Sequence, residues 1–320
     1  VPPDLPARVI SLGKEAGAPR RVRTARYLRA IESATREGPA GRPAALLVHM
    51  CPIYLSLAAP IAKPRGVRLL LWYAQAAAGG SLALAERCAS AILTSVPGAY
   101  PTENPGKLVA IGQAIDTEHF PFTPRERAGP LRLLALGRTA PVKCYPVAIR
   151  AVDAVRATGE DVRLAIVGPS TTPAEQAERA LLRALVDELA LGEAVQLAGP
   201  LPRAQVPAAI AAFDALVNVT EDGSADKSVF EAMAIGRPVL TANPALGPLM
   251  DNLALPIRLA SARVSDLAEG IRQLAGAAPG VANEVGWELR QRVLSSHSVE
   301  HWATGVVAQL SLPMPQGVER

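Results

Sequence analysis

The feature of this sequence that most constrains its fold is the regular return of short apolar runs between helix-forming stretches. Runs that are apolar throughout are typical of parallel strands buried on both faces, and the intervening helices supply the crossover connections. In the first part of the chain we predict strands at residues 7–13, 44–50, 68–73, 89–96 and 107–116. The sequence therefore predicts an α/β protein built on parallel sheets.

The same alternation starts again after residues 122–130, a segment of proline, glycine and charged residues that we interpret as a linker. Beyond it we predict strands at residues 131–137, 162–168, 194–199, 214–219 and 238–242. Two such units leave a cleft between them, and open α/β sheets bind ligands at the carboxyl ends of their strands. The first unit has too few strands for a complete nucleotide-binding sheet, so we expect further residues before Val1.

The sequence also predicts helices between these strands and after the last of them. Residues 172–175 read Thr-Pro-Ala-Glu, a capping box with proline at the first helical position. We also predict helices at 146–158 and 265–275, and a last helix from Val299 with Ser298 as its N-cap.

A helix predicted at residues 20–38, with Leu28 and Ile31 facing inward, has a broad basic face. Its arginines spread over about half of the circumference. They are Arg20, Arg21, Arg23, Arg26 and Arg29. This face fits a solvated surface, contact with an anionic membrane, or recognition of an acidic acceptor.

Composition excludes several classes of protein. The net charge is only +4 with both signs interspersed, which does not favour nucleic-acid binding. No apolar run approaches the roughly 20 residues that span a bilayer, and the first residues lack the pattern of a signal peptide. The cysteines are Cys51, Cys88 and Cys144, without CxxC or histidine pairing, so we expect no disulfide framework or zinc site and a reducing, cytoplasmic location.

Two stretches carry candidate chemistry. Arg138 and Lys143 follow a predicted strand and precede a helix, where two cations favour a phosphate or diphosphate, although solvated loop charges are the alternative. The second stretch, residues 223–243, combines a glycine loop, a short helix with Glu231 among apolar residues, a glycine stop and a strand. Glu231 needs a partner, either sugar hydroxyls or Lys227 four residues earlier on the same helix face.

These stretches together resemble the donor-binding half of group 1 (family 4-like) retaining glycosyltransferases. The resemblance is carried by GRTAPVK (137–143), VRLAIVG (162–168), residues 194–219 and GSADKSVFEAMAIGRPVLTAN (223–243). It covers residues 131–310 and extends more weakly into the first half. It implies the GT-B fold, with two facing Rossmann-like domains at 1–125 and 126–296 and a C-terminal helix at 297–320 that crosses back to the first domain.

The resemblance also implies roles for individual residues. Arg138 and Lys143 match the pair that holds the nucleotide diphosphate, and Glu231 matches the acidic residue that binds the ribose. The remaining donor-binding positions are Gly137, Gly168, Gly223, Ser224, Asp226 and Lys227. The family needs neither a metal nor a cofactor beyond its nucleotide-sugar co-substrate.

The sequence departs from the family at two positions. Gly223 stands where many relatives have a second glutamate, so we expect sugar contacts from the loop backbone and from Asp226 or Lys227, with the role of Glu221 open. Gln75 stands near the position where relatives often carry a histidine. Glutamine cannot transfer a proton, so any proton-transfer role of that histidine must either be taken by His49 or be dispensable.

The leading hypothesis is a metal-independent retaining glycosyltransferase that uses a nucleotide sugar and a lipid-linked, polysaccharide or small-molecule acceptor. A nucleotide-sugar epimerase, a phosphorylase and an inactive nucleotide-sugar-binding relative are the alternatives. Asp116 is interpreted as structural, and His119, His297 and His301 as surface or packing residues.

Overall fold

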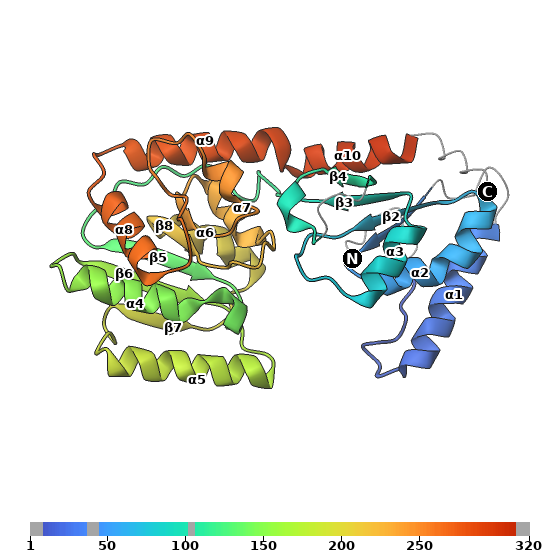
Figure 1. Ribbon diagram of the computed structural model, residues 1–320, viewed down its shortest axis with the longest axis horizontal. Helices are drawn as coiled ribbons and strands as arrows, with labels where there is room; N and C mark the ends of the chain where they lie inside the picture. The colour runs from blue at the N-terminus through green and yellow to red at the C-terminus, as the bar shows by residue number, and fades with distance from the viewer. Residues whose placement is uncertain (1–8, 37–44, 102–105, 312–320) are drawn as a thin grey trace.

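The computed structural model describes residues 9–36, 45–101 and 106–311. They form two sheets of parallel strands that lie side by side, together with the helices that cover them (Figure 1). The first sheet has the order β1-β2-β3-β4 and the second the order β7-β6-β5-β8-β9. Short 3-10 turns lie at Lys63–Arg65, Pro97–Ala99, Pro141–Lys143, Arg203–Gln205 and Gly247–Met250. The predicted α/β class with parallel sheets is confirmed.

The first domain combines the four-stranded sheet with helices that precede or connect its strands. Its elements are α1 (Arg20–Arg36), β1 (Ala45–His49), α2 (Pro52–Ala62), β2 (Arg68–Trp72), α3 (Gly80–Cys88), β3 (Ala91–Thr94) and β4 (Leu108–Ala110). Helix α1 packs on α2, where the Tyr27 hydroxyl donates to the carbonyl oxygen of Tyr54 at 2.9 Å.

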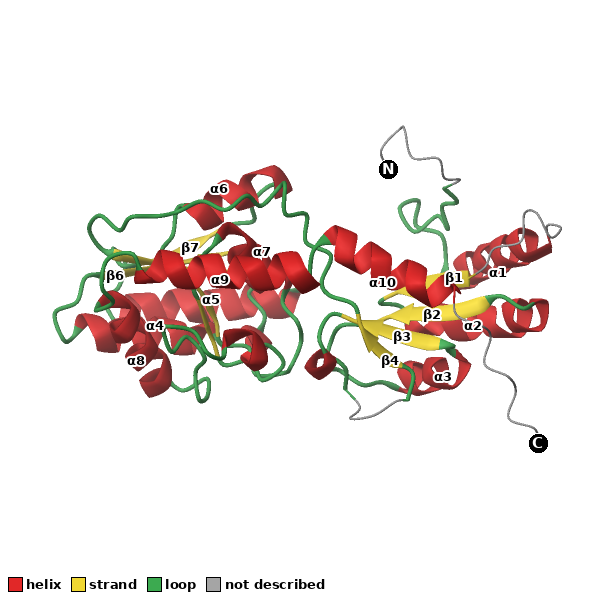
Figure 2. Ribbon diagram, turned by 90° about the horizontal axis from the view of Figure 1, so that it is seen from above, coloured by secondary structure: helices red, strands yellow, loops and turns green. Residues whose placement is uncertain are grey.

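Strand β2 is buried on both faces because helices cover the sheet from both sides. Leu69 and Leu71 belong to one apolar cluster, which includes residues of α2 and α3. Leu70 and Trp72 belong to a second cluster, against which the helix α10 (Val299–Ser311) packs. Figure 2 shows α10 over one face of this sheet, so the last described helix completes the core of the first domain.

The second domain holds the five-stranded sheet between two layers of helices. Its strands are β5 (Leu131–Leu136), β6 (Val162–Val167), β7 (Val195–Ala198), β8 (Ala215–Asn218) and β9 (Val239–Thr241). The helices α4, α5 and α8 pack together on one side, and α6, α7 and α9 on the other (Figure 1). Their bounds are α4 Tyr145–Arg156, α5 Pro173–Glu188, α6 Val206–Ala211, α7 Lys227–Ile235, α8 Val264–Ala275 and α9 Val281–Ser296.

The strand order of the second sheet reverses between β5 and β8. The chain proceeds outward from β5 through β6 to β7, then returns to place β8 on the other side of β5. At such a switch point the loops that follow the two central strands diverge, which leaves space for a ligand at their carboxyl ends. The loops after β5 and β8 are those in which the sequence places its candidate site.

The chain crosses between the domains twice, and the two crossings lie against each other. The amide of Ile115 donates to the carbonyl of His297 at 2.8 Å, and the amide of Val299 donates to the carbonyl of Ile115 at 3.0 Å. Gly112 has φ of +83°, and a Cβ there would lie 2.0 Å from the carbonyl oxygen of Ser296. Only glycine permits this approach.

Arginines of the second domain bind backbone carbonyls of the linker and of the residues just before it. Arg290 on α9 donates to the carbonyl of Phe120 at 2.9 Å, and the buried Arg237 donates to that of Thr123 at 2.8 Å. Burial lowers the pKa of Arg237 to about 10, with the neighbouring Arg125 as a further cause. The linker itself, at residues 122–130, has no helix or strand, as predicted.

Most predicted elements are present, but one predicted strand is wrong and several helices were missed. The strand predicted at residues 7–13 is wrong for its described part, since Val9 and Ile10 are exposed and lie outside any strand. The helices α3, α6 and α9 had no prediction of their own. The capping box of Thr172 and Glu175 is confirmed, as is the N-cap of Ser298, whose hydroxyl accepts from the amide of His301 at 3.1 Å.

The helix predicted at residues 20–38 is present to Arg36, with Ile31 buried and Leu28 half-buried, and Gly38 lies outside the described residues. Asp116 accepts hydrogen bonds from the amides of Glu118 and His119, which fits its structural interpretation. Among the described residues, no helix is long and apolar enough to cross a membrane.

Candidate active site

Lys143 and Asp226 form an ion pair between the loops that follow β5 and β8. Lys143 ends the 3-10 turn before α4, and Asp226 precedes the first residue of α7. Each side chain is 15% exposed, so the pair is largely shielded from water. The second carboxylate oxygen of Asp226 accepts from Asn218 Nδ2 at 2.6 Å and from Thr220 Oγ1 at 3.2 Å. Asp226 is therefore held in one orientation toward the ammonium group.

Tyr145 lies in the core near this pair. The side chain is buried, and its hydroxyl lies 3.1 Å from where a Cβ of Gly137 would be. Burial, and then the negative charge of Asp226, raise the pKa of Tyr145. The phenol thus stays protonated beside the carboxylate.

Arg138 is paired with Glu175, the capping-box glutamate of α5. Arg138 Nη1 lies 2.6 Å from Glu175 Oε1, with the arginine side chain 61% exposed and the glutamate 4% exposed. Glu175 Oε2 also accepts from the amides of Thr171 and Thr172 and from the Thr171 hydroxyl. These donors, the two amides first, lower the pKa of Glu175 to about 2. Arg138 thus lies at the edge of the site, bound to a fixed carboxylate.

Glu231 is paired with Arg203, not with Lys227. Arg203 Nη1 lies 2.5 Å from Glu231 Oε1, and the glutamate side chain is only 4% exposed. The guanidinium of Arg203 lies over the ring of Phe120, 5.0 Å from its centroid. The alternative in which Lys227 pairs with Glu231 is wrong. A cation from the loop after β7 neutralises the buried carboxylate instead.

The loop that contains Gly223 and Ser224 contacts the first domain. The amide of Ala76, after β2, donates to Ser224 Oγ at 3.4 Å, and Gln113 Nε2 donates to the carbonyl of Ala225 at 3.3 Å. Within its own domain, Asn243 Nδ2 holds the carbonyl of Ser224 at 2.7 Å. The carboxyl-end loops of both sheets therefore meet at this loop.

His49 and Lys227 approach each other from the two domains. His49 ends β1 and is exposed, with its ring stacked against Trp72 at a centroid distance of 6.2 Å. Partial desolvation lowers the pKa of His49, and the positive charge of Lys227 lowers it further. Within the described ranges, the side chain of Lys227 makes no hydrogen bond or ion pair. Gln75 is turned toward its own domain and donates to Tyr73 Oη at 2.9 Å.

Gly168 has a packing explanation. A Cβ at this position would lie 1.9 Å from the carbonyl oxygen of Gly137, so the ends of β5 and β6 approach only because residue 168 is glycine. Its predicted contact with the donor stays a prediction, as do the donor-binding roles of the other predicted residues.

The structure thus brings most of the predicted residues to the carboxyl edge of the second sheet, with His49 facing them from the first domain. Arg203 and Glu175 were missed as partners. Arg203 could have been considered, since it lies in the loop after a predicted strand, whereas nothing local assigns Glu175 to Arg138. In the described part of the chain, no group of three or more His, Cys, Asp and Glu side chains is arranged to hold a metal ion. The absence of a metal requirement stays a prediction.

Comparisons with known proteins agree with this architecture. Residues 130–276 match the family model described as Glycosyl transferases group 1. No curated protein matches the chain. Among solved structures, Anabaena Alr3699/HepE in complex with UDP and glucose is similar, with a TM-score of 0.72 and 17% identity over 96% of this chain and 84% of that one.

Two further structures show the same likeness. A glycosyltransferase from Rickettsia africae ESF-5 has a TM-score of 0.71 and 13% identity over 95% of this chain and 83% of its own. Sucrose-phosphate synthase from Thermosynechococcus elongatus has a TM-score of 0.68 and 18% identity over 91% and 79%. The chain therefore shares the two-domain GT-B fold of these structures, and its residues 130–276 match the group 1 glycosyl transferase model.

Proposed function

We propose that this protein is a glycosyltransferase, which moves a sugar from a nucleotide-sugar donor to a carbohydrate or lipid-linked acceptor with retention of configuration and without a metal. The observation that carries the proposal is the pair of Lys143 and Asp226 at the β5/β8 switch point, beside the N-terminus of α7. Loops and a helix N-terminus at this edge of a doubly wound sheet are suited to a phosphorylated ligand. We assign the finer subtype as family 4-like, with the GSADK and EAM motifs.

The donor proposal is supported by what similar proteins contain. Anabaena Alr3699/HepE has been solved with UDP and with UDP-glucose. The Staphylococcus aureus protein TarM has been solved with UDP and α-GlcNAc-glycerol. A uridine nucleotide sugar is therefore the first donor class to test on this chain.

Lys143 and Arg138 are proposed to stabilise the departing diphosphate. Glycosyl transfer from a nucleotide sugar develops negative charge on that group, and in a metal-free site side-chain cations must offset it. At a separation of about 4 Å and an effective dielectric constant near 20, each cation contributes about 4 kcal/mol before desolvation. Both are engaged by carboxylates in this structure, Lys143 by Asp226 and Arg138 by Glu175, so the diphosphate must share or displace those partners.

Glu231 is proposed to bind the ribose hydroxyls. Its carboxylate is buried, and Arg203 supplies the positive charge that makes burial tolerable. Because Arg203 is 55% exposed, its side chain has room to move when a nucleotide enters, while Glu231 stays fixed on α7.

His49 is the proposed group on the acceptor side. Its lowered pKa favours the neutral imidazole, the form that accepts a proton from an acceptor hydroxyl. The protein is proposed to act in the cytoplasm with no cofactor other than the co-substrate. Peripheral contact with an anionic membrane through the arginines of α1 is a further proposal, and failure to sediment with anionic liposomes at low salt would remove it.

A donor screen tests the function directly. Thermal unfolding is measured with UDP-, GDP-, ADP- and dTDP-sugars, since a ligand at 100 times its dissociation constant adds about 2.7 kcal/mol of stability. Hydrolysis of the stabilising donor then separates an enzyme from a binder. The matched variant is the Arg138→Ala, Lys143→Ala double mutant, with Arg183→Ala on α5 as the control. Near-normal turnover by the folded double mutant would show that Arg138 and Lys143 do not stabilise the diphosphate.

A further inference from the structure

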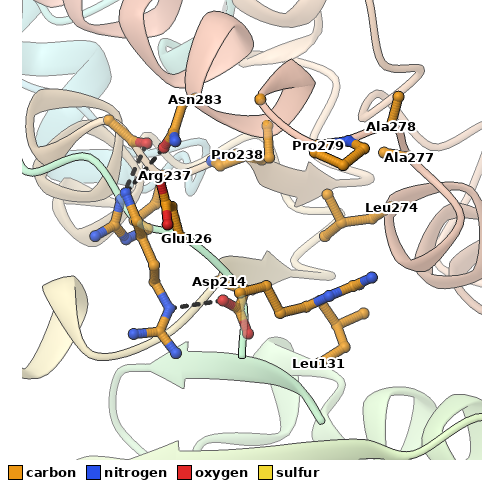
Figure 3. A pocket seen from close by; sticks show the side chains of 15 residues that line it. Glu126, Leu131, Asp214, Arg237, Pro238, Leu274, Ala277, Ala278, Pro279 and Asn283 are labelled. Carbon is orange, nitrogen blue, oxygen red and sulfur yellow. Dashed lines mark hydrogen bonds and ion pairs between the residues drawn. The ribbon is translucent and has the colours of Figure 1, made fainter. Parts of the chain in front are cut away.

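A pocket of about 350 Å³ lies in the second domain, at the edge opposite the proposed donor site (Figure 3). Its lining includes Leu131 at the start of β5, Asp214 just before β8 and Pro238 just before β9. These are amino ends of strands, whereas Lys143 and Asp226 follow carboxyl ends. The pocket therefore lies at the opposite edge of the sheet, and its size is within the range of about 300–1,000 Å³ typical of small-molecule sites.

One wall of this pocket is apolar. It is formed by Leu131 and Pro238 on one side and by Leu274, Ala277, Pro279 and Ala282 on the other. Figure 3 shows Leu274 and Pro279 facing the space between the strand ends and the segment that joins α8 to α9. A hydrocarbon chain or ring suits such a surface.

The other wall is charged and carries free hydrogen-bond donors. Arg125 uses Nε to bind Asp214 Oδ1 at 2.6 Å, and Arg127 uses Nη2 to bind the carbonyl of Ala275 at 2.8 Å. In the described part of the chain, nothing accepts from the two Nη groups of Arg125 or from Nη1 of Arg127. The other oxygen of Asp214 is occupied by the amide of Arg132 at 2.7 Å, so Asp214 does not compete for them.

The charges around the pocket favour a monoanion. Three guanidinium groups line it, those of Arg125, Arg127 and Arg237, together with the two carboxylates of Glu126 and Asp214. One positive charge is in excess. Arg237 is 2% exposed and bonds only to carbonyl oxygens, so its charge has no carboxylate in direct contact. A carboxylate ligand matches one excess charge and the forked donors of arginine, whereas a dianion would exceed it.

We propose that this pocket binds a small monoanionic carboxylate with an apolar body, its carboxylate on Arg125 and Arg127 and its body against the wall of Leu131 and Leu274. The ligand would connect the interdomain linker to the segment between α8 and α9. The site is separate from the donor site and does not depend on the function proposed above.

The test uses two probes of the same shape, 4-phenylbutyrate and its neutral amide 4-phenylbutyramide. Isothermal titration calorimetry of the full chain should show the carboxylate binding about tenfold or more tightly than the amide, as expected for a charge-assisted contact. Equal binding of the two probes, or no binding of the carboxylate, would overturn the proposal.

Two variants locate the binding. Ala282→Leu fills the apolar side and should abolish binding of 4-phenylbutyrate. Arg127→Gln, at an exposed position that need not affect folding, should weaken it about fivefold or more. Arg183→Gln on α5 makes the same change of charge far from the pocket lining and should leave it unchanged. If Arg127→Gln binds like the wild type, or if the folded Ala282→Leu protein still binds, the site is elsewhere and the proposal is wrong.

Discussion

Replacing Lys143 by methionine removes the ammonium group but keeps much of the side-chain volume. We expect a modest loss of stability, which a second substitution can restore, and a large loss of turnover, which it cannot. Asp226 then keeps its hydrogen bonds from Asn218 and Thr220 on one oxygen and loses the partner of the other. A partly buried acceptor without a partner costs about 1–3 kcal/mol. We expect the free energy of unfolding of Lys143→Met to fall by that amount.

The double variant Lys143→Met, Asp226→Asn separates the two effects. Removing the second charge eliminates the unpaired carboxylate, so the double variant should regain about half or more of the lost stability. Turnover should not recover, because the proposed diphosphate site still lacks its cation. A loss of about 4 kcal/mol of electrostatic stabilisation corresponds to roughly a thousandfold in kcat.

Urea unfolding and steady-state turnover of the stabilising donor are measured on the wild type, both single variants and the double variant. Arg183→Met supplies the control for loss of a cation elsewhere. Recovery of turnover together with stability in the double variant would refute the reasoning, since Lys143 would then act only as the structural partner of Asp226.

Three further predictions concern stability. Gly168→Ala forces a Cβ against the backbone of Gly137 and should lower the free energy of unfolding by about 1–3 kcal/mol in urea, whereas Gly192→Ala, with open space around it, should change it by less than about 0.5 kcal/mol. The folded-state pKa of Glu175, about 2, lies below its ordinary value, so its contribution is complete above pH 4.5 and is lost as the pH falls toward 2. Urea midpoints at pH 5 and pH 2.5 should therefore differ less in Glu175→Gln than in the wild type. Burial lowers the pKa of His297 to about 4, so the free energy of unfolding falls as the pH is lowered from 6.5 toward 4. His297→Phe should remove about 2–3 kcal/mol of this pH dependence, measured by urea unfolding between pH 7 and pH 4.

The fold was largely predictable because its strands are buried on both faces and therefore apolar throughout. Strand β2, with every residue buried, is the clearest example. The strand predicted at residues 7–13 is wrong because a short apolar run forms a strand only beside a neighbouring strand, and Val9 and Ile10 are exposed. Helix α9 was missed although Val285, Leu289 and Val293 recur every four residues, since Gly286 and the surrounding charges weaken the pattern.

The candidate site was predictable only as a set of residue types at strand ends. The sequence places Arg138, Lys143 and Glu231 there, but pairing depends on which loops the strand order brings together. Lys143 meets a carboxylate 83 positions away, and Arg138 one 37 positions away. Glu231 pairs with Arg203, 28 positions away, and not with Lys227, four positions away. The strand order brings the distant loop of Arg203 to the carboxylate.

The packing of α10 on the first sheet has a consequence for how the chain is made. Leu70, Trp72, Leu93 and Ile111 form one face of that sheet, and the residues that pack against them include Trp302, Val306 and Leu310. During synthesis this face has no cover from α10 until the last described helix leaves the ribosome, after the second domain has been translated. The domain that begins first is thus completed last, and a truncated chain that ends before Val299 should expose an aggregation-prone sheet face instead of an independently stable unit.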